Sequence, residues 1–288
     1  MKFWQPRISR RTIAIAAALV GTVSLAIGAH AALNKRALDA ASAVATEQGT
    51  DTATKASRLA LVIGNGHYPD AGEPLAQSIN DARALSAALR RDGFDVDVVE
   101  DASKDDMSRA IDRLRAKIRH DSVVMLFFGG YGVQVGRESY MIPVDAAIWR
   151  ESDVRRDGFS VEAALDMMKA QGARAKLVVL DASRRNPYER RFRSFSHGLA
   201  PIAAPDNALV LTSATPGKVA EDSKGENSVL VTELLNHLNA QAVGAEAAFN
   251  KTRVAISRAS EGEQVPSVSS SLLEDVRFGA AEAEAAGG

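Results

Sequence analysis

Two segments of the chain place chemically capable side chains directly after predicted buried strands. Tyr131 lies between two glycines after the apolar run 122–128, and Ser183 follows Asp181 after the apolar run 176–180. A serine hydroxyl is a weak nucleophile that needs a base beside it. Tyrosine is a poor base, because with a pKa of about 10 only about one molecule in a thousand is ionised at pH 7. Efficient catalysis by these residues would require a neighbour that lowers the pKa of Tyr131.

The chain contains no cysteine, which removes several kinds of chemistry at once. Disulfides, thiolate metal sites and cysteine nucleophiles are all excluded. A histidine from a distant loop would be the other candidate base for Ser183, and His67 and His197 lie in predicted loops.

The loop after the first predicted strand imitates only part of a dinucleotide-binding motif. Gly64-Asn65-Gly66 begins such a motif, but Pro69 stands where the third glycine belongs. The sequence has no His-Glu-x-x-His, Walker A or Gly-x-Ser-x-Gly motif. We therefore expect neither a nucleotide nor another cofactor.

Strand and helix signals alternate along residues 58–278, and this pattern predicts how the chemical residues are positioned. Apolar runs predict strands at 58–63, 94–99, 122–128, 176–180 and 208–212, with a last extended segment at 265–271. Helical spacing predicts helices at 77–91, 161–170, 229–238 and 245–260, and a capping box at Ser103 and Asp106 opens another. The alternation predicts a three-layer α/β fold, a mostly parallel sheet with helices on both faces. Ligands bind such sheets beyond the carboxyl ends of the strands.

Several motifs in this order make the chain resemble the caspase-like peptidase family, which includes the bacterial metacaspase relatives. The motifs are Leu61-Val62-Ile63-Gly64-Asn65, Asn80-Asp81-Ala82, Tyr140-Met141-Ile142-Pro143-Val144-Asp145, Thr212-Ser213-Ala214-Thr215-Pro216-Gly217 and Gln264-Val265-Pro266. Where bacterial members and metacaspases typically have Gly-His-Gly and Asp-x-Cys, this chain has Gly130-Tyr131-Gly132 and Asp181-Ala182-Ser183. The resemblance covers residues 58–278 and implies a caspase–haemoglobinase fold. Its larger subdomain would end near residue 193, and the smaller one would follow.

The resemblance implies a cysteine-type endopeptidase, but Tyr131 and Ser183 replace the catalytic histidine and cysteine. We therefore expect a pseudo-peptidase that binds peptides or partner proteins, with Tyr131 and Ser183 hydrogen-bonded to each other in an unused cleft. The alternative is an active endopeptidase that cleaves after Arg or Lys with Ser183 as nucleophile. Gly132 and the Ser183 amide match the family's oxyanion-stabilising positions.

The resemblance also implies a binding site for a basic side chain. Metacaspase-type relatives have an acidic pocket, and the matching positions here are Asp81 and Asp181. Two convergent carboxylates would pair with an Arg or Lys side chain, so the expected partner is a peptide or protein with basic residues. The other interpretation of Asp81 is helix capping, because an acidic residue in a first turn suits the helix dipole.

A calcium site, which metacaspases often have, is not expected in this chain. Asp145 and Asp157 lie near the corresponding region, but Arg155 and Arg156 stand beside the second of them. These cations would repel a hard dication. No other metal site is indicated.

A cluster of arginines has no counterpart in the resemblance. It comprises Arg184, Arg185, Arg190, Arg191 and Arg193, with Tyr188 and Phe192 among them. Such a cluster can bind phosphates or anionic lipid, and the plainer interpretation is an exposed loop. With a net charge of −1 and an exported body, nucleic acid is not an expected partner.

The N-terminus resembles an export signal. Lys2, Arg7, Arg10 and Arg11 precede the apolar stretch Thr12–Ala32, which contains a candidate cleavage site after Ala31. If it is uncleaved, this stretch is long enough to anchor the chain. Residues 1–32 are thus a signal peptide or signal anchor, 33–57 a flexible linker and 279–288 a disordered tail. We expect a body that is periplasmic, or anchored in the inner membrane and facing the periplasm.

Overall fold

The structure of the chain is a computed structural model that describes residues 57–69, 74–188, 197–220, 225–238 and 243–278. The predicted export segment 1–32, nearly all of the predicted linker and the predicted tail lie outside these residues. Among the residues that are described, no helix is both long and apolar enough to cross a bilayer.

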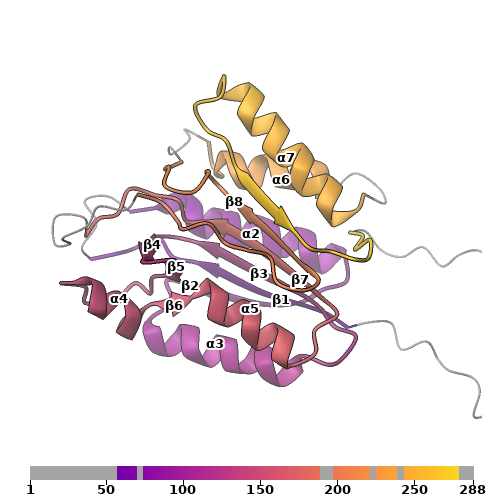
Figure 1. Cartoon of the computed structure of the whole chain (residues 1–288), viewed down its shortest axis with the longest axis horizontal. Helices are drawn as coiled ribbons and strands as arrows, with labels where there is room; N and C mark the ends of the chain where they lie inside the picture. Colours follow the sequence, from indigo (N-terminus) through magenta and orange to yellow (C-terminus); the bar gives the residue numbers. More distant parts are fainter. Residues whose placement is uncertain (1–56, 70–73, 189–196, 221–224, 239–242, 279–288) are drawn as a thin grey trace, which may run out of the picture. The chain divides into compact units, whose positions relative to one another are not determined.

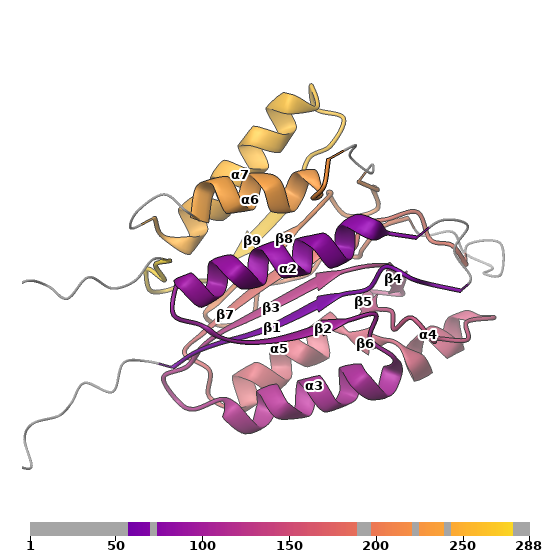
Figure 2. The same cartoon turned by 180° about the vertical axis from the view of Figure 1, so that it is seen from behind.

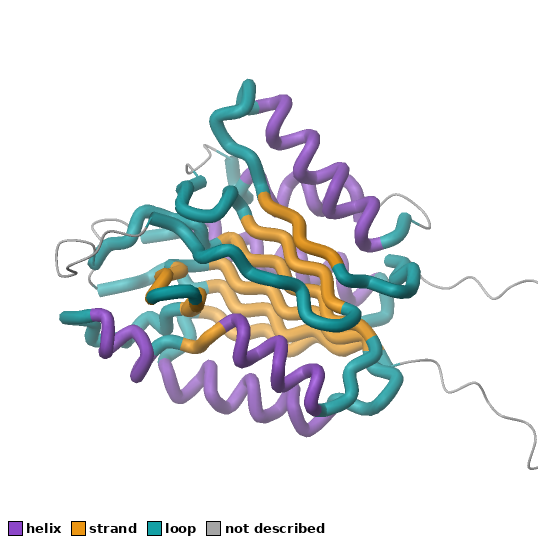
Figure 3. The backbone as a smooth tube through the Cα atoms, viewed as in Figure 1, coloured by secondary structure: helices purple, strands orange, loops and turns teal. Residues whose placement is uncertain are grey.

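A six-stranded sheet forms the centre of the domain, with the strand order β2-β1-β3-β7-β8-β9 (Figures 1 and 3). The first five of these strands are parallel, and β9 pairs antiparallel with β8. The strands are β1 (Arg58–Gly64), β2 (Asp95–Glu100), β3 (Val123–Gly129), β7 (Ala175–Asp181), β8 (Ala208–Thr212) and β9 (Ser267–Ser270).

Both faces of the sheet are apolar because its central strands are buried on both sides. In β1, Leu59, Leu61 and Ile63 point into one core cluster, while Ala60 and Val62 point into the other. Successive side chains of a strand alternate between faces, so a continuous apolar run serves two layers at once.

Helices cover each face of the sheet (Figure 2). On one face lie α2 (Ala76–Arg91), α6 (Val229–Leu238) and α7 (Ala245–Ala259), and on the other lie α3 (Lys104–Lys117) and α5 (Val161–Ala170). The three-layer α/β fold expected from the sequence is confirmed.

The start of α3 shows how local sequence sets an element. The Ser103 side chain accepts a hydrogen bond from the Asp106 amide, and the Asp106 carboxylate accepts one from the Ser103 amide. This reciprocal capping satisfies two amides that the helix leaves unpaired. Below the cap, the buried Met107, Ala110 and Leu114 fix the helix against the sheet.

The predicted elements are confirmed, with ends that differ by one or two residues, but four further elements were not predicted. A small antiparallel sheet consists of β4 (Gly132–Val135), β5 (Glu138–Met141) and β6 (Phe159–Ser160), and α4 covers Glu151–Asp157. These elements are short and mix polar with apolar residues, so none produces a clear periodic pattern.

Replacement of Ser103 by alanine tests the capping box. We expect Ser103→Ala to lower the free energy of unfolding by about 1 kcal/mol, because an amide at the helix start loses its acceptor. Urea denaturation followed by circular dichroism measures this change. Ser108→Ala, on the exposed side of the same helix, is the control and should change stability little. Equal losses in both variants would contradict the assigned role of the cap.

Candidate functional site

The candidate site lies at the carboxyl ends of the parallel strands, where the strand order changes direction. The chain passes from β1 to β2 on one side and then returns to β3 on the other side of β1. Such a reversal opens a crevice beyond the strand ends, which is the usual ligand position in open α/β sheets. Gly64 of β1, Gly129 of β3 and Asp181 of β7 are register partners in one row across this edge.

Helix α2 reaches this row because Gly64 has no side chain. A Cβ atom at Gly64 would lie 2.5 Å from the Ser78 carbonyl oxygen and 2.7 Å from the Ala82 Cβ. A Cβ at Gly129 would lie 3.4 Å from the Ser78 Cβ. The second turn of α2, which carries Asp81, therefore packs directly against the ends of β1 and β3.

Tyr131 is half-buried and held by its neighbour Tyr68. The two rings meet edge to face with centroids 4.8 Å apart, and the Tyr131 amide donates to the Tyr68 hydroxyl at 3.1 Å. Burial raises the pKa of Tyr131 above its usual value, while the charge of Arg184 opposes this shift in part. The phenol is therefore neutral at pH 7, the opposite of what a general base requires.

Ser183 is 1% exposed, and its Oγ has no hydrogen-bond partner among the described residues. The expected hydrogen bond between the hydroxyls of Tyr131 and Ser183 is therefore wrong. The Ser183 carbonyl accepts from the Ala220 amide at 2.6 Å, so the 218–220 segment lies against it. A serine nucleophile needs a hydrogen-bonded base, and this hydroxyl has none among the described residues.

The two amides at the oxyanion positions already have acceptors within the protein. Gly132 donates to the Ala182 carbonyl at 3.0 Å, and Ser183 donates to the Ser213 Oγ at 3.4 Å. A Cβ at Gly132 would lie 2.7 Å from the same Ala182 carbonyl, so close packing accounts for this glycine. The oxyanion role of Gly132 stays a prediction.

Asp81 is fully buried at 0% exposed, and its two carboxylate oxygens differ. Oδ1 accepts from the Asn227 side-chain amide and from the Ser228 backbone amide, each at 2.9 Å. Oδ2 is buried without a hydrogen-bond partner among the described residues. Burial, and then the charge of Asp181, raise the pKa of Asp81 to about 6, although the hydrogen bonds from Asn227 and Ser228 oppose the shift.

Helix capping does not account for Asp81. Helix α2 begins at Ala76 and has no acidic residue in its first turn, so this interpretation is wrong. Asp81 instead faces the start of another helix, since Ser228 directly precedes α6.

Asp181 forms an ion pair with Arg184 in the interior. The Arg184 Nη2 lies 3.2 Å from the Asp181 Oδ2, and the two side chains are 5% and 2% exposed. The expectation that the arginine cluster forms an exposed loop is therefore wrong for Arg184, and Tyr188 is also buried. Arg185 is exposed, while the remaining arginines of the cluster, Arg190, Arg191 and Arg193, lie outside the described residues.

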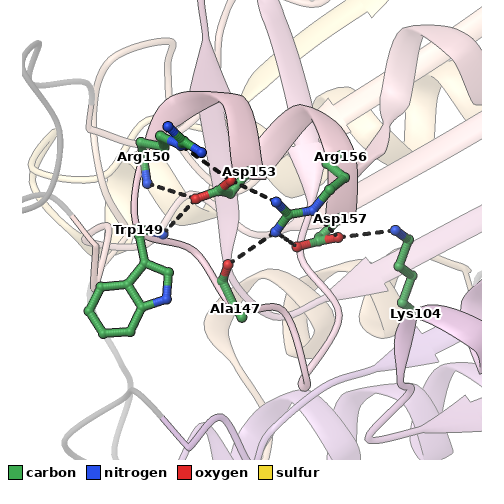
Figure 4. Close-up of polar contacts among 7 residues, drawn as sticks. All are labelled: Lys104, Ala147, Trp149, Arg150, Asp153, Arg156 and Asp157. Atoms are coloured by element: carbon green, nitrogen blue, oxygen red, sulfur yellow. Dashed lines mark hydrogen bonds and ion pairs between the residues drawn. The ribbon is translucent and has the colours of Figure 1, made fainter.

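Of the two acidic residues considered for calcium, Asp157 is paired with cations (Figure 4). Asp157 accepts from the Lys104 Nζ at 3.0 Å and from Arg156, which also binds Asp153. Asp145 accepts from the Lys104 backbone amide at 2.8 Å. No group of three potential metal ligands occurs within the described part of the chain.

The His67 side chain contacts the loop after β2. Its Nδ1 lies 2.6 Å from the Asp101 Oδ2, and Asp101 also accepts from the amides of Gly66 and His67. The side chain of His67 is 64% exposed. These contacts give His67 a role in holding the loop after β1.

Sequence reasoning brought Asp81 and Asp181 together only through the family resemblance, and it missed Asn227, Ser228 and the pairing by Arg184. Asn227 lies 146 residues from Asp81, so no local pattern connects them. The one available signal for the ion pair was in the sequence, where Arg184 lies three positions after Asp181.

Comparison with known proteins agrees with this architecture. The family model described as "Caspase domain" matches residues 57–277. The human protein "Mucosa-associated lymphoid tissue lymphoma translocation protein 1" is 28% identical to the chain over 144 residues. That alignment covers 50% of this chain and 17% of the human protein, so the chain corresponds to a small part of that relative.

The family match begins just before β1 and ends at residue 277, next to the last described residue. The sheet order and the layers of the structure fit the same fold. The chain belongs to the caspase domain family.

Proposed function

We propose that this caspase domain binds a basic side chain of a peptide or protein partner and does not cleave the partner. The observation that carries the proposal is the unpartnered Oδ2 of Asp81, buried beside a second carboxylate. An ionised carboxylate oxygen in the interior is costly unless a hydrogen-bonded cation or a proton compensates it.

The charges of the site support a cationic ligand. Above pH 6 Asp81 is mostly ionised, and Asp181 forms its ion pair with the cation Arg184. The site then has one positive charge for two negative charges. A guanidinium or ammonium group from a ligand would balance the second carboxylate and supply the donor that Asp81 Oδ2 lacks.

The contacts of Tyr131 and Ser183 support binding without cleavage. Burial keeps the Tyr131 phenol protonated, and the Ser183 hydroxyl is buried without a base. Both oxyanion-position amides donate to protein atoms. Hydrolysis would require each of these three features to change before a tetrahedral intermediate could form.

Two further parts of the proposal rest on the sequence alone. The stretch Thr12–Ala32 supports export of the domain, by which it would meet its partner in the periplasm. An anionic surface remains a proposal only for Arg185, Arg190, Arg191 and Arg193, because Arg184 is buried.

Binding of the basic side chain is tested with a fluorescently labelled, amidated peptide that carries one arginine among glycines and serines. The matched peptide replaces arginine by citrulline, which has the same shape without the charge. We expect fluorescence anisotropy at pH 7.5 to show at least about tenfold tighter binding of the arginine peptide, because the lost charge-assisted hydrogen bonds contribute about 1.5–3 kcal/mol. Equal affinities, or no binding of either peptide, would refute the proposal.

Cleavage is tested with fluorogenic peptides that carry Arg or Lys before the scissile bond. The full chain and its Ser183→Ala variant should give the same background signal. Turnover that disappears in Ser183→Ala would instead establish the alternative, an endopeptidase with Ser183 as nucleophile.

The buried carboxylate also predicts a pH-dependent effect on stability. A raised pKa means that folded Asp81 holds a proton which the unfolded chain releases near pH 4, so this group destabilises the fold increasingly as pH rises from about 4 to about 6. Asp81→Asn removes this penalty. We expect it to raise the free energy of unfolding by about 2–3 kcal/mol at pH 8 and hardly at all at pH 4, as measured by urea denaturation.

Asp181→Asn provides the contrasting variant. It leaves the Arg184 charge buried without its carboxylate, which should lower stability by about 3–5 kcal/mol at pH 8. If both variants change stability in the same direction, the division of roles between the two carboxylates is wrong.

A further inference from the structure

The segment that donates hydrogen bonds to Asp81 is fixed to α2 by polar side chains of that helix. We call Gly225–Ser228 the strap. Gln77 donates to the carbonyls of Gly225 and Asn227, and Asn80 donates to the carbonyl of Glu226. Two more hydrogen bonds run from the strap to Asp81. The strap therefore meets one face of α2 over its first two turns.

The two hydrogen bonds to Asp81 have an effect that the other three lack. Asn227 Nδ2 and the Ser228 amide both donate to Oδ1, each at 2.9 Å. This arrangement fixes the carboxylate and leaves Oδ2 as the oxygen without a hydrogen-bond partner among the described residues. Asn227 supplies the side-chain hydrogen bond to Oδ1, and the Ser228 backbone amide and hydroxyl also favour the ionised form of Asp81.

We propose that Asn227 is the positioning residue of the acidic site, which holds Asp81 through one oxygen and thereby sets the pH range over which the other oxygen accepts a basic side chain. This inference rests on the proposed function, because it concerns the same acidic pair. It gives Asn227, which does not lie at a strand end, a role in ligand binding.

The charges around Asp81 define what Asn227 can change. Asp181 on β7 disfavours the ionised form of Asp81, and Asp181 is itself paired with Arg184. The strap contributes two neutral donors, Asn227 and Ser228, which favour the ionised form. Removal of the Asn227 donor leaves the repulsion from Asp181 less opposed, so Asp81 would take up its proton at a higher pH.

The test measures binding of the labelled arginine peptide to the full chain between pH 5 and pH 8.5. In the unaltered protein, affinity should fall as pH decreases through about 6. In Asn227→Ala the midpoint of this fall should move up by about one pH unit, which makes binding about fivefold weaker at pH 6 and nearly unchanged at pH 8. Asn227→Ser keeps a shorter hydrogen-bond donor, so its midpoint should lie between those of the unaltered protein and Asn227→Ala. It replaces Asn227→Ala in the test if that variant does not fold.

Asn80→Ala is the matched control, because it removes a bond between α2 and the strap without touching Asp81. It should leave the midpoint unchanged. An equal loss of affinity at every pH in Asn227→Ala, or a shift of the same size in Asn80→Ala, would show that Asn227 acts only through the fold and would overturn the inference. If the unaltered chain does not bind the peptide at any pH, the proposed function itself fails. If it binds but Asn227→Ala does not shift the midpoint, only the inference about Asn227 fails.

Discussion

The close approach of α2 to the end of β1 determines where Asp81 lies in the acidic site. Gly64 leaves room for the Ser78 carbonyl and the Ala82 side chain to contact the strand. Since side chains three or four positions apart share one face of a helix, Ser78, Asp81 and Ala82 all face the strand ends. The same face brings Asp81 beside Asp181, a register neighbour of the β3 terminus. A larger residue at the end of β1 would displace α2 and separate the two carboxylates.

The candidate site has two parts, the neutral side chains at the dyad positions and the charged acidic pair. At the dyad positions, burial keeps a phenol neutral and surrounds a serine hydroxyl with protein. At the acidic pair, the same burial holds two like charges close together. Burial of uncompensated charge costs stability and persists where it serves binding or specificity. Under the proposed function, the uncompensated charge at Asp81 is the part of the site that recognises a ligand.

Much of the fold was predictable from the sequence, and the site was predictable only in part. Continuous apolar runs identified β1, β3, β7 and β8, because a strand buried on both faces contains little else. The β4–β5 hairpin was missed because its strands are short and mixed in polarity. Asp81 and Asn227 meet only through the packing of α2 on α6, across 146 residues. Arg184 was expected at the surface with its neighbours, but a buried carboxylate three residues earlier stabilises it in the interior.

The pairing of Arg184 with Asp181 means that the domain already holds, within its own chain, the kind of side chain that the acidic pair would recognise. A tethered group acts at a high effective concentration, set by chain geometry and independent of solution conditions. A guanidinium group from a partner would therefore compete with Arg184 for the acidic pair. The affinity measured for that partner would then include the cost of displacing Arg184. Under the proposed function, contacts beyond the one basic residue would strengthen binding, because they help the incoming side chain to share the site with this internal occupant.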